Sequence, residues 1–290
     1  MAGSQPMPPM LWQTPTRTFD FTRRGAIMGV LNVTPDSFSD GGRWVDVNAA
    51  VAHALEMAAH GAEIIDVGGE STRPGAHPIA EEEELRRVLP VIERLAGERS
   101  IAISIDTMKW GVARAAVERG AKIINDVTGL RDPAMREVVR STGAAAVIMH
   151  MQGDPQTMQA APHYDDVTRE VGEFFRQRLE LCLASGIDPT RLAFDPGIGF
   201  GKTVAHNLTL LGNLEFVRVG ERPLVVGVSR KSFLSKVTGT ERVEDRDWPT
   251  VALTSFLRER GANVLRVHDV QPNVQALRMT EAILHGVDTA

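Results

Sequence analysis

Residues 101–106 read Ile-Ala-Ile-Ser-Ile-Asp, an apolar run that ends on a carboxylate. The run is rich in isoleucine, which favours a strand of a parallel sheet that is covered on both faces. The stretch that follows, Trp110–Arg119, has helical apolar spacing and stops at Gly120, a residue that commonly ends a helix. A buried strand followed by an amphipathic helix is the repeating unit of α/β proteins.

The same unit recurs along the whole chain. Eight apolar runs predict strands at Ala26–Leu31, Glu63–Val67, Ile101–Ile105, Lys122–Ile124, Ala145–Met149, Leu192–Phe194, Leu224–Val228 and Asn263–Val267. Helices are predicted at Asn48–Ala59, Glu81–Leu95, Trp110–Arg119, Pro133–Thr142, Asp165–Ser185 and Thr250–Arg260. Eight such units predict a (β/α)8 TIM barrel in the α/β class, and an open doubly wound sheet is the alternative. We expect residues 1–24 to be a partly irregular lead-in and residues 25–290 to form the single barrel domain.

Composition excludes several classes of protein. The chain of 290 residues carries a net charge of −5, so it lacks the basic surface that a nucleic-acid partner requires. The N-terminus has no apolar run long enough for a signal peptide, and no apolar span is long enough for a transmembrane helix. A single cysteine, Cys182, cannot form an internal disulfide, and its apolar surroundings indicate a structural thiol and not a nucleophile. We therefore expect a soluble cytoplasmic protein.

Polar residues stand at the ends of the predicted strands. They are Asn32, Asp66, Asp106, Asn125, His150, Asp195 and Ser229, with Arg266 and His268 at the eighth strand. In a barrel all strand C-termini meet at one face, which is where active sites are built. The alternative is that turns simply favour Asp, Asn and Ser. Turn chemistry does not explain the whole series, so we predict one site at this face.

Two long polar loops follow the first two strands. Residues 32–42 read Asn-Val-Thr-Pro-Asp-Ser-Phe-Ser-Asp-Gly-Gly, and residues 68–75 read Gly-Gly-Glu-Ser-Thr-Arg-Pro-Gly. Purely connective loops are usually shorter. Long glycine-bearing loops over a catalytic face often close around a ligand and exclude water. We predict that both loops are lids.

At these residues a family becomes recognisable. The segments GVLNVTPDSFSDGG (29–42), IIDVGGESTRPG (64–75), SIDT (104–107), IINDVTG (123–129), MHMQGDPQTMQ (149–159), FDPGIGFGK (194–202), GVSRKSFL (227–234) and LRVHDV (265–270) resemble the dihydropteroate synthase pattern in the same order. The similarity covers nearly the whole chain. It implies a pterin-binding barrel, a transferase of folate biosynthesis in which 4-aminobenzoate displaces diphosphate from a pterin-methyl diphosphate, with Mg²⁺.

The chemistry of the pterin suits the strand-end residues. A dihydropterin presents adjacent N–H donors along one edge, and a carboxylate can accept two parallel bonds from such an edge. By resemblance Asp195 lies deep in the barrel and is the candidate for this contact. Helix N-capping is the alternative role for both Asp195 and Asp106. The resemblance and the donor inventory together place the following residues at the pterin: Thr72, Asp106, Asn125, Met149, Asp195, Phe200 and Lys231.

The diphosphate needs cations. Arg266 and His268 are two residues apart on an extended segment, so both side chains can leave on the same side and clamp an anion. Asn32 resembles the family's Mg²⁺ ligand, and Mg²⁺ usually takes its other ligands from water and substrate phosphate. The sequence contains neither an HExxH nor a CxxC motif, so it does not suggest a zinc site.

The second substrate carries a carboxylate. Ser232 is predicted to open a helix after the seventh strand, where free N–H groups bind carboxylates, with Arg230 as a helper. Phe38 and Pro74, one from each loop, are expected to close over the aromatic ring. Asp40 and Arg73 are expected to pair across the two loops as part of the catalytic machinery.

These residues predict dissociative substitution, in which diphosphate departs before the neutral arylamine attacks. Lys231, Arg266, His268, Asp40 and Arg73 are the predicted catalytic residues. Two alternatives are a pterin-barrel methyltransferase acting on methyltetrahydrofolate and a catalytically silent paralogue. The resemblance implies a homodimer, although residues 244–250, Glu-Asp-Arg-Asp-Trp-Pro-Thr, depart from the family pattern in a region that often lies near the subunit interface.

Overall fold

A closed parallel barrel forms the centre of the molecule. The computed structural model describes residues 9–34, 46–72 and 75–286. One parallel sheet runs in the order β8-β7-β6-β5-β4-β3-β10-β9. Its strands are β3 (Ala26–Asn32), β4 (Ile64–Gly68), β5 (Ala102–Asp106), β6 (Ile123–Asp126), β7 (Ala145–Met149), β8 (Leu192–Asp195), β9 (Val225–Gly227) and β10 (Val264–Val267). A parallel bridge between Phe194 and Leu224 joins the two edges and closes the sheet. This closure confirms the predicted TIM barrel and overturns the open-sheet alternative.

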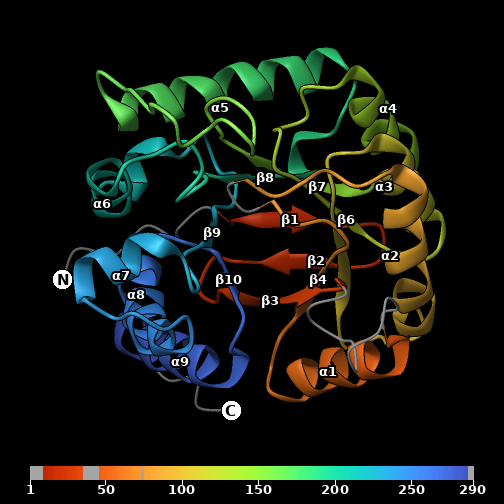
Figure 1. Ribbon diagram of the computed structural model, residues 1–290, viewed down its shortest axis with the longest axis horizontal. Coiled ribbons are helices and arrows are strands. Elements are labelled where there is room, and N and C mark those ends of the chain that lie inside the picture. Colours follow the sequence, from red (N-terminus) through yellow and green to blue (C-terminus); the bar gives the residue numbers. More distant parts are fainter. Residues whose placement is uncertain (1–8, 35–45, 73–74, 287–290) are drawn as a thin grey trace.

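The helices surround this barrel (Figure 1). They are α1 (Val47–Ala59), α2 (Glu81–Leu95), α3 (Trp110–Glu118), α4 (Pro133–Thr142), α5 (Val167–Ala184), α6 (Val204–Gly212), α7 (Ser232–Thr238), α8 (Asp247–Glu259) and α9 (Val270–His285). All six predicted helices are present. The predicted start of α8 at Thr250 is three residues late, because Pro249 falls in the first turn, where its missing N–H leaves no intrahelical bond unmade.

Side chains of each strand alternate between two cores. On β4, Ile65 and Val67 face outward into the large apolar core between strands and helices. Ile64 faces the barrel interior, and Asp66 follows on the same side, because alternate residues of a strand share a face. The interior is therefore apolar in its lower part and becomes polar toward the C-terminal ends of the strands.

A hairpin covers the lower end of the barrel. The strands β1 (Leu11–Gln13) and β2 (Thr18–Asp20) pair antiparallel, and they lie at the centre of the ring of helices in Figure 1. Trp12, Phe19 and Phe21 are buried against the interior apolar residues of the barrel strands. The Trp12 indole Nε1 donates to the carbonyl oxygen of Arg191 (2.9 Å). The lead-in that was expected to be partly irregular thus contains an ordered plug.

The divergent segment 244–250 has a structural role. A single 3-10 turn, Glu244–Arg246, leads into α8. Arg230 adopts a positive φ of 59° and makes two hydrogen bonds of 2.9 Å with the carboxylate of Asp247. Arg246 Nη1 donates to the Arg230 carbonyl oxygen (2.9 Å). Because its guanidinium is held by Asp247, Arg230 is less suited to the predicted role of carboxylate helper.

Two predictions from composition concern the described residues. Among them, no helix combines the length and the apolar character that a membrane span needs. Cys182 is fully buried on α5, and burial raises the pKa of its thiol to about 11. A thiol that stays protonated at neutral pH is a poor nucleophile, which confirms the structural interpretation.

Candidate active site

The strand ends bring an arginine and two carboxylates together inside the barrel. Arg266 Nε donates to Asp66 Oδ2 (2.6 Å), and Arg266 Nη2 donates to Asp106 Oδ2 (2.8 Å). Asn125 Nδ2 donates to the same Asp66 Oδ2 (2.9 Å). Four strands, β4, β5, β6 and β10, thus contribute to one polar network. The predicted convergence of residues 106, 125 and 266 is present in the structure.

The electrostatics of this network follow from burial. Burial alone would lower the pKa of Arg266, but Asp66 and Asp106 outweigh it, so the pKa is raised and the guanidinium stays charged. Burial raises the pKa of Asp106 against the opposing charge of Arg266. Asp106 Oδ1 is buried and has no hydrogen-bond partner among the described residues. A buried acceptor without a partner is costly, so it is well placed to receive a donor from a ligand.

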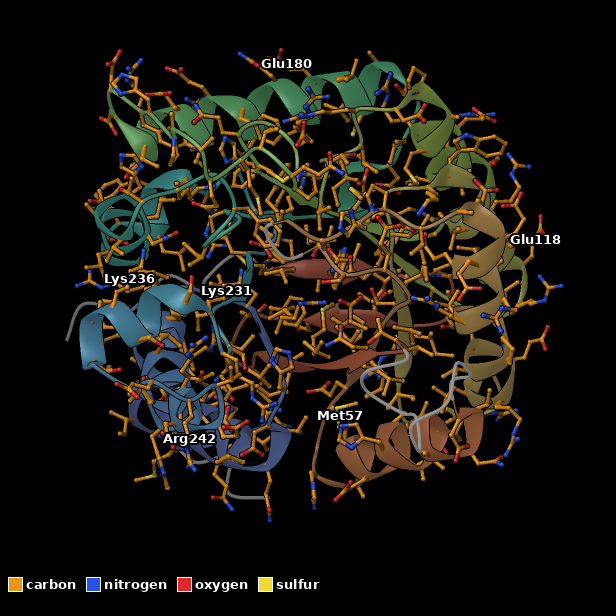
Figure 2. The ribbon with its side chains drawn as sticks, in the orientation of Figure 1. Met57, Glu118, Glu180, Lys231, Lys236 and Arg242 are labelled. Carbon is orange, nitrogen blue, oxygen red and sulfur yellow. The ribbon has the colours of Figure 1, made fainter. Side chains whose placement is uncertain are left out.

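Asp195 and Lys231 form a second charged group at the mouth. Asp195 is buried, and its Oδ1 accepts from the backbone N–H of Gly197 (2.7 Å). Burial raises the pKa of this carboxyl, while the charge of Lys231 opposes the shift. Burial lowers the pKa of Lys231 to about 8, with Asp195 opposing. Figure 2 shows Lys231 at the end of α7 nearest the barrel and Lys236 farther out along that helix.

An apolar wall lies beside these charges. Lys231 Nζ donates to the Ile198 carbonyl oxygen and stands 4.7 Å from the centre of the Phe200 ring. Phe200 packs with Met149 in one small apolar cluster, together with Met108. Polar acceptors on one side and flexible apolar side chains on the other suit a flat heteroaromatic ring. Met149 and Phe200 thus lie in one apolar cluster beside Lys231, and their contact with a ring stays a prediction.

Four other predicted residues are described at the same face. Asn32 is the last residue of β3, and Thr72 is half-buried in the loop after β4. Ser232 is the first residue of α7, as predicted. His268 follows β10, and its Nδ1 lies 2.9 Å from the hydroxyl of Ser229. Neither Asp106 nor Asp195 caps a helix, because Lys109 and Thr203 are the N-cap residues of α3 and α6.

Four predicted residues lie outside the described part of the chain. Phe38 and Asp40 fall within residues 35–45, and Arg73 and Pro74 are residues 73–74. The lid function of the two loops and the pairing of Asp40 with Arg73 stay predictions.

A buried lysine behind the site, Lys202, has no role among those predicted from the sequence. Lys202 Nζ lies 2.9 Å from His150 Nδ1 and donates to the carbonyl oxygens of Gly197 and Phe200 (both 3.0 Å). Gly197 has a φ of 64°, and a Cβ there would overlap the His150 carbonyl oxygen. Lys202 thereby fixes the turn that carries Phe200. Its place at the end of the glycine-rich segment FDPGIGFGK was the available signal.

The residues at the strand ends limit the kind of metal site that could form there. Within the residues that the structure describes, no three or more His, Cys, Asp or Glu side chains come together in a way that could hold a metal ion. Asn32 offers a single amide oxygen. This set does not form a closed protein cage, but it fits a Mg²⁺ ion that takes its remaining ligands from water and a phosphorylated substrate.

This barrel, with acceptors, cations and an apolar wall at its mouth, defines an α/β-barrel enzyme that binds a small heteroaromatic molecule. A family model described as "Pterin binding enzyme" matches residues 28–268. The dihydropteroate synthase of Escherichia coli K12 is 46% identical over 258 residues, covering 89% of this chain and 91% of that protein. The dihydropteroate synthase of Synechocystis is 42% identical over 267 residues, covering 91% of this chain and 92% of that protein.

Solved structures agree. The Xanthomonas albilineans dihydropteroate synthase with 4-aminobenzoic acid superposes with a TM-score of 0.89 at 45% identity, covering 96% of this chain and 99% of that one. The same enzyme in complex with 7,8-dihydropteroate gives a TM-score of 0.86 at 43% identity, covering 95% and 99%. This chain belongs to the dihydropteroate synthase family of pterin-binding enzymes.

Proposed function

We propose that this protein condenses (7,8-dihydropterin-6-yl)methyl diphosphate with 4-aminobenzoate to give 7,8-dihydropteroate and diphosphate. The observation that carries the proposal is the buried cluster of Arg266 with Asp66, Asp106 and Asn125. It offers charged and neutral acceptors at the end of the barrel where such enzymes act. Relatives of 42–46% identity are dihydropteroate synthases, and they match nearly the full chain.

The pterin would bind with its N–H edge toward the acceptors. Asp195 would accept two parallel bonds, Asp106 Oδ1 would accept a third, and Lys231 would donate to the pterin carbonyl. The ring would lie against Met149 and Phe200, which share an apolar cluster. Thr72 would contact the pterin diphosphate from the loop after β4.

The leaving diphosphate would be held by Arg266 and His268. Two of the five guanidinium N–H donors are used by Asp66 and Asp106, so up to three remain for phosphate oxygens. Mg²⁺ held by Asn32 and the substrate phosphates would add positive charge there when it is bound. The C–O bond breaks first, and the electron-rich dihydropterin delocalises the positive charge that develops on its exocyclic carbon.

The arylamine then forms the new C–N bond and releases a proton. A neutral arylamine is nucleophilic at pH 7, so positioning and electrostatics suffice without a strong base. Ser232, at the start of α7, would contact the 4-aminobenzoate carboxylate. Phe38 and Pro74 would cover its ring, and Asp40 would pair with Arg73 when the loops close.

The function is tested by turnover of 4-aminobenzoate and pterin diphosphate in the presence of Mg²⁺. Asp195→Asn should weaken pterin binding at least tenfold, because one charge-assisted bond is lost. Arg266→Ala should lower kcat through the leaving group. Wild-type turnover in Arg266→Ala would remove the clamp from the mechanism. Turnover of methyltetrahydrofolate with a corrinoid acceptor would instead favour the methyltransferase alternative, and no turnover of either substrate the silent paralogue.

We also propose a cytoplasmic homodimer whose interface includes α8 and α9. Large apolar side chains are exposed on these helices: Trp248 (78%), Met279 (65%) and Ile283 (75%). Exposed apolar patches often mark protein–protein contacts. Ile283→Glu should yield a monomer in light scattering, whereas Phe216→Glu, on the exposed turn Leu214–Val217, should leave the mass unchanged.

A further inference from the structure

Asp66 belongs to the buried cluster on which the proposed function rests, but no contact with a substrate is assigned to it there. Its side chain is fully buried on β4. Oδ2 accepts from Arg266 Nε on β10 (2.6 Å) and from Asn125 Nδ2 on β6 (2.9 Å). One oxygen thus joins two strands that are not neighbours in the barrel, and both of its partners are proposed or predicted ligand residues.

The contact with Asn125 determines which amide atom faces the ligand. An ionised carboxylate is only an acceptor, so it can bind only the NH2 group of the asparagine. Because Nδ2 is turned toward Asp66, the carbonyl oxygen Oδ1 lies on the opposite side of the amide, and one N–H of Nδ2 is not used by Asp66. The contact therefore fixes which way the amide is turned and presents its acceptor oxygen on the side away from Asp66.

The contact with Arg266 fixes the plane of the guanidinium. Asp66 binds Nε, and Asp106 binds Nη2 of the same flat group (2.8 Å). A guanidinium that is held along one edge by two carboxylates has lost its rotational freedom before any ligand arrives. Pre-organised donors stabilise a ligand or a transition state better than mobile ones.

We infer that Asp66 is a positioning residue. It orients the amide of Asn125 so that its oxygen can accept from an N–H donor of the ligand, and it holds the guanidinium of Arg266 in place. Both hydrogen bonds of its Oδ2 go to protein groups, and its Oδ1 is buried without a partner among the described residues. This role rests on the function proposed above. A substitution at Asp66 should therefore weaken binding of the pterin diphosphate and have little effect on binding of 4-aminobenzoate.

The test compares three variants of the full chain. Asp66→Ala should raise KM for the pterin diphosphate at least tenfold and leave KM for 4-aminobenzoate within twofold. Asp66→Asn keeps an acceptor oxygen of the same shape, so it should recover part of that loss. Ser104→Ala is the matched control, because Ser104 is buried on β5 directly opposite Asp66 in the sheet register and its hydroxyl has no partner among the described residues. It should retain wild-type constants.

The outcomes separate this inference from the function. If the wild type fails to make dihydropteroate, the proposed function is wrong. If the wild type is active and Asp66→Ala matches Ser104→Ala in both KM values, the positioning role is wrong. Equal increases in both KM values for Asp66→Ala, or a loss in Asp66→Asn as large as in Asp66→Ala, would also overturn it. Circular dichroism of each variant identifies a fold defect. If Asp66→Ala has one, the result for Asp66→Asn decides. An unchanged KM for the pterin diphosphate would rule out the positioning role, and an increase in that KM alone would support it.

Discussion

His150 should make the stability of this protein sensitive to acid. Its imidazole is buried at the end of β7, with Nδ1 2.9 Å from Lys202 Nζ and the Phe174 ring edge-on at 4.9 Å. Burial, aided by the positive charge of Lys202, lowers the pKa of His150 to about 2. The folded protein therefore keeps this imidazole neutral across the physiological range.

The sign and size of the effect follow from linkage. The folded pKa lies below the unfolded value of about 6.5, so only the unfolded chain takes up a proton between these two values. The stabilisation is fully present above pH 6.5 and is lost as the pH falls. Each unit of separation corresponds to about 1.4 kcal/mol, so at pH 5 the loss is about 2 kcal/mol. His150→Asn, whose amide oxygen can still accept from Lys202, cannot titrate and should escape this loss.

Equilibrium urea unfolding at pH 8 and pH 5 measures the effect. Between these pH values the wild type should lose about 2 kcal/mol more stability than His150→Asn. Phe174→Leu, which alters the packing of the same ring without removing the titrating group, should keep the wild-type dependence. An identical pH dependence in the wild type and His150→Asn would refute the reasoning.

Three other substitutions test the structure. Trp12→Ala removes the centre of the hairpin plug and should lower the free energy of unfolding by about 3–5 kcal/mol in urea. Glu281→Leu leaves the buried guanidinium of Arg258 without its ion pair (3.0 Å) and should cost about 3–5 kcal/mol in thermal unfolding, most of which a second change, Arg258→Met, should restore. Gly197→Ala should weaken pterin binding in calorimetry, because the new Cβ overlaps the carbonyl oxygen of His150, which follows β7; unchanged affinity would contradict this.

The barrel was predictable because its strands are continuous apolar runs with helical patterns between them. The predicted strand Ile101–Ile105 is shifted by one residue at each end from β5 (Ala102–Asp106). The hairpin was missed because β1 and β2 span three residues each, too few to show a period. The helix α6 was also missed, although Thr203 caps it by accepting from the backbone N–H of His206.

The candidate site was predictable as a set of residues and not as a network. A polar residue at the end of each apolar run is visible in the sequence, and the barrel topology brings these residues to one face. Pairings such as Asp66 with Arg266 depend on side-chain reach across strands that are 200 positions apart in sequence. The glycine-rich segment FDPGIGFGK signals a turn that ends at Lys202, but the buried contact of Lys202 with His150 depends on the path of that turn at Gly197.

The aromatic plug at the lower end of the barrel has a kinetic consequence. Trp12, Phe19 and Phe21 seal that end, and the apolar interior above them is fully packed. Among the described residues, access to the strand ends from the lower side is therefore closed, and substrates and product would use the C-terminal face of the barrel. Accumulated product should therefore compete with the incoming pterin at this face.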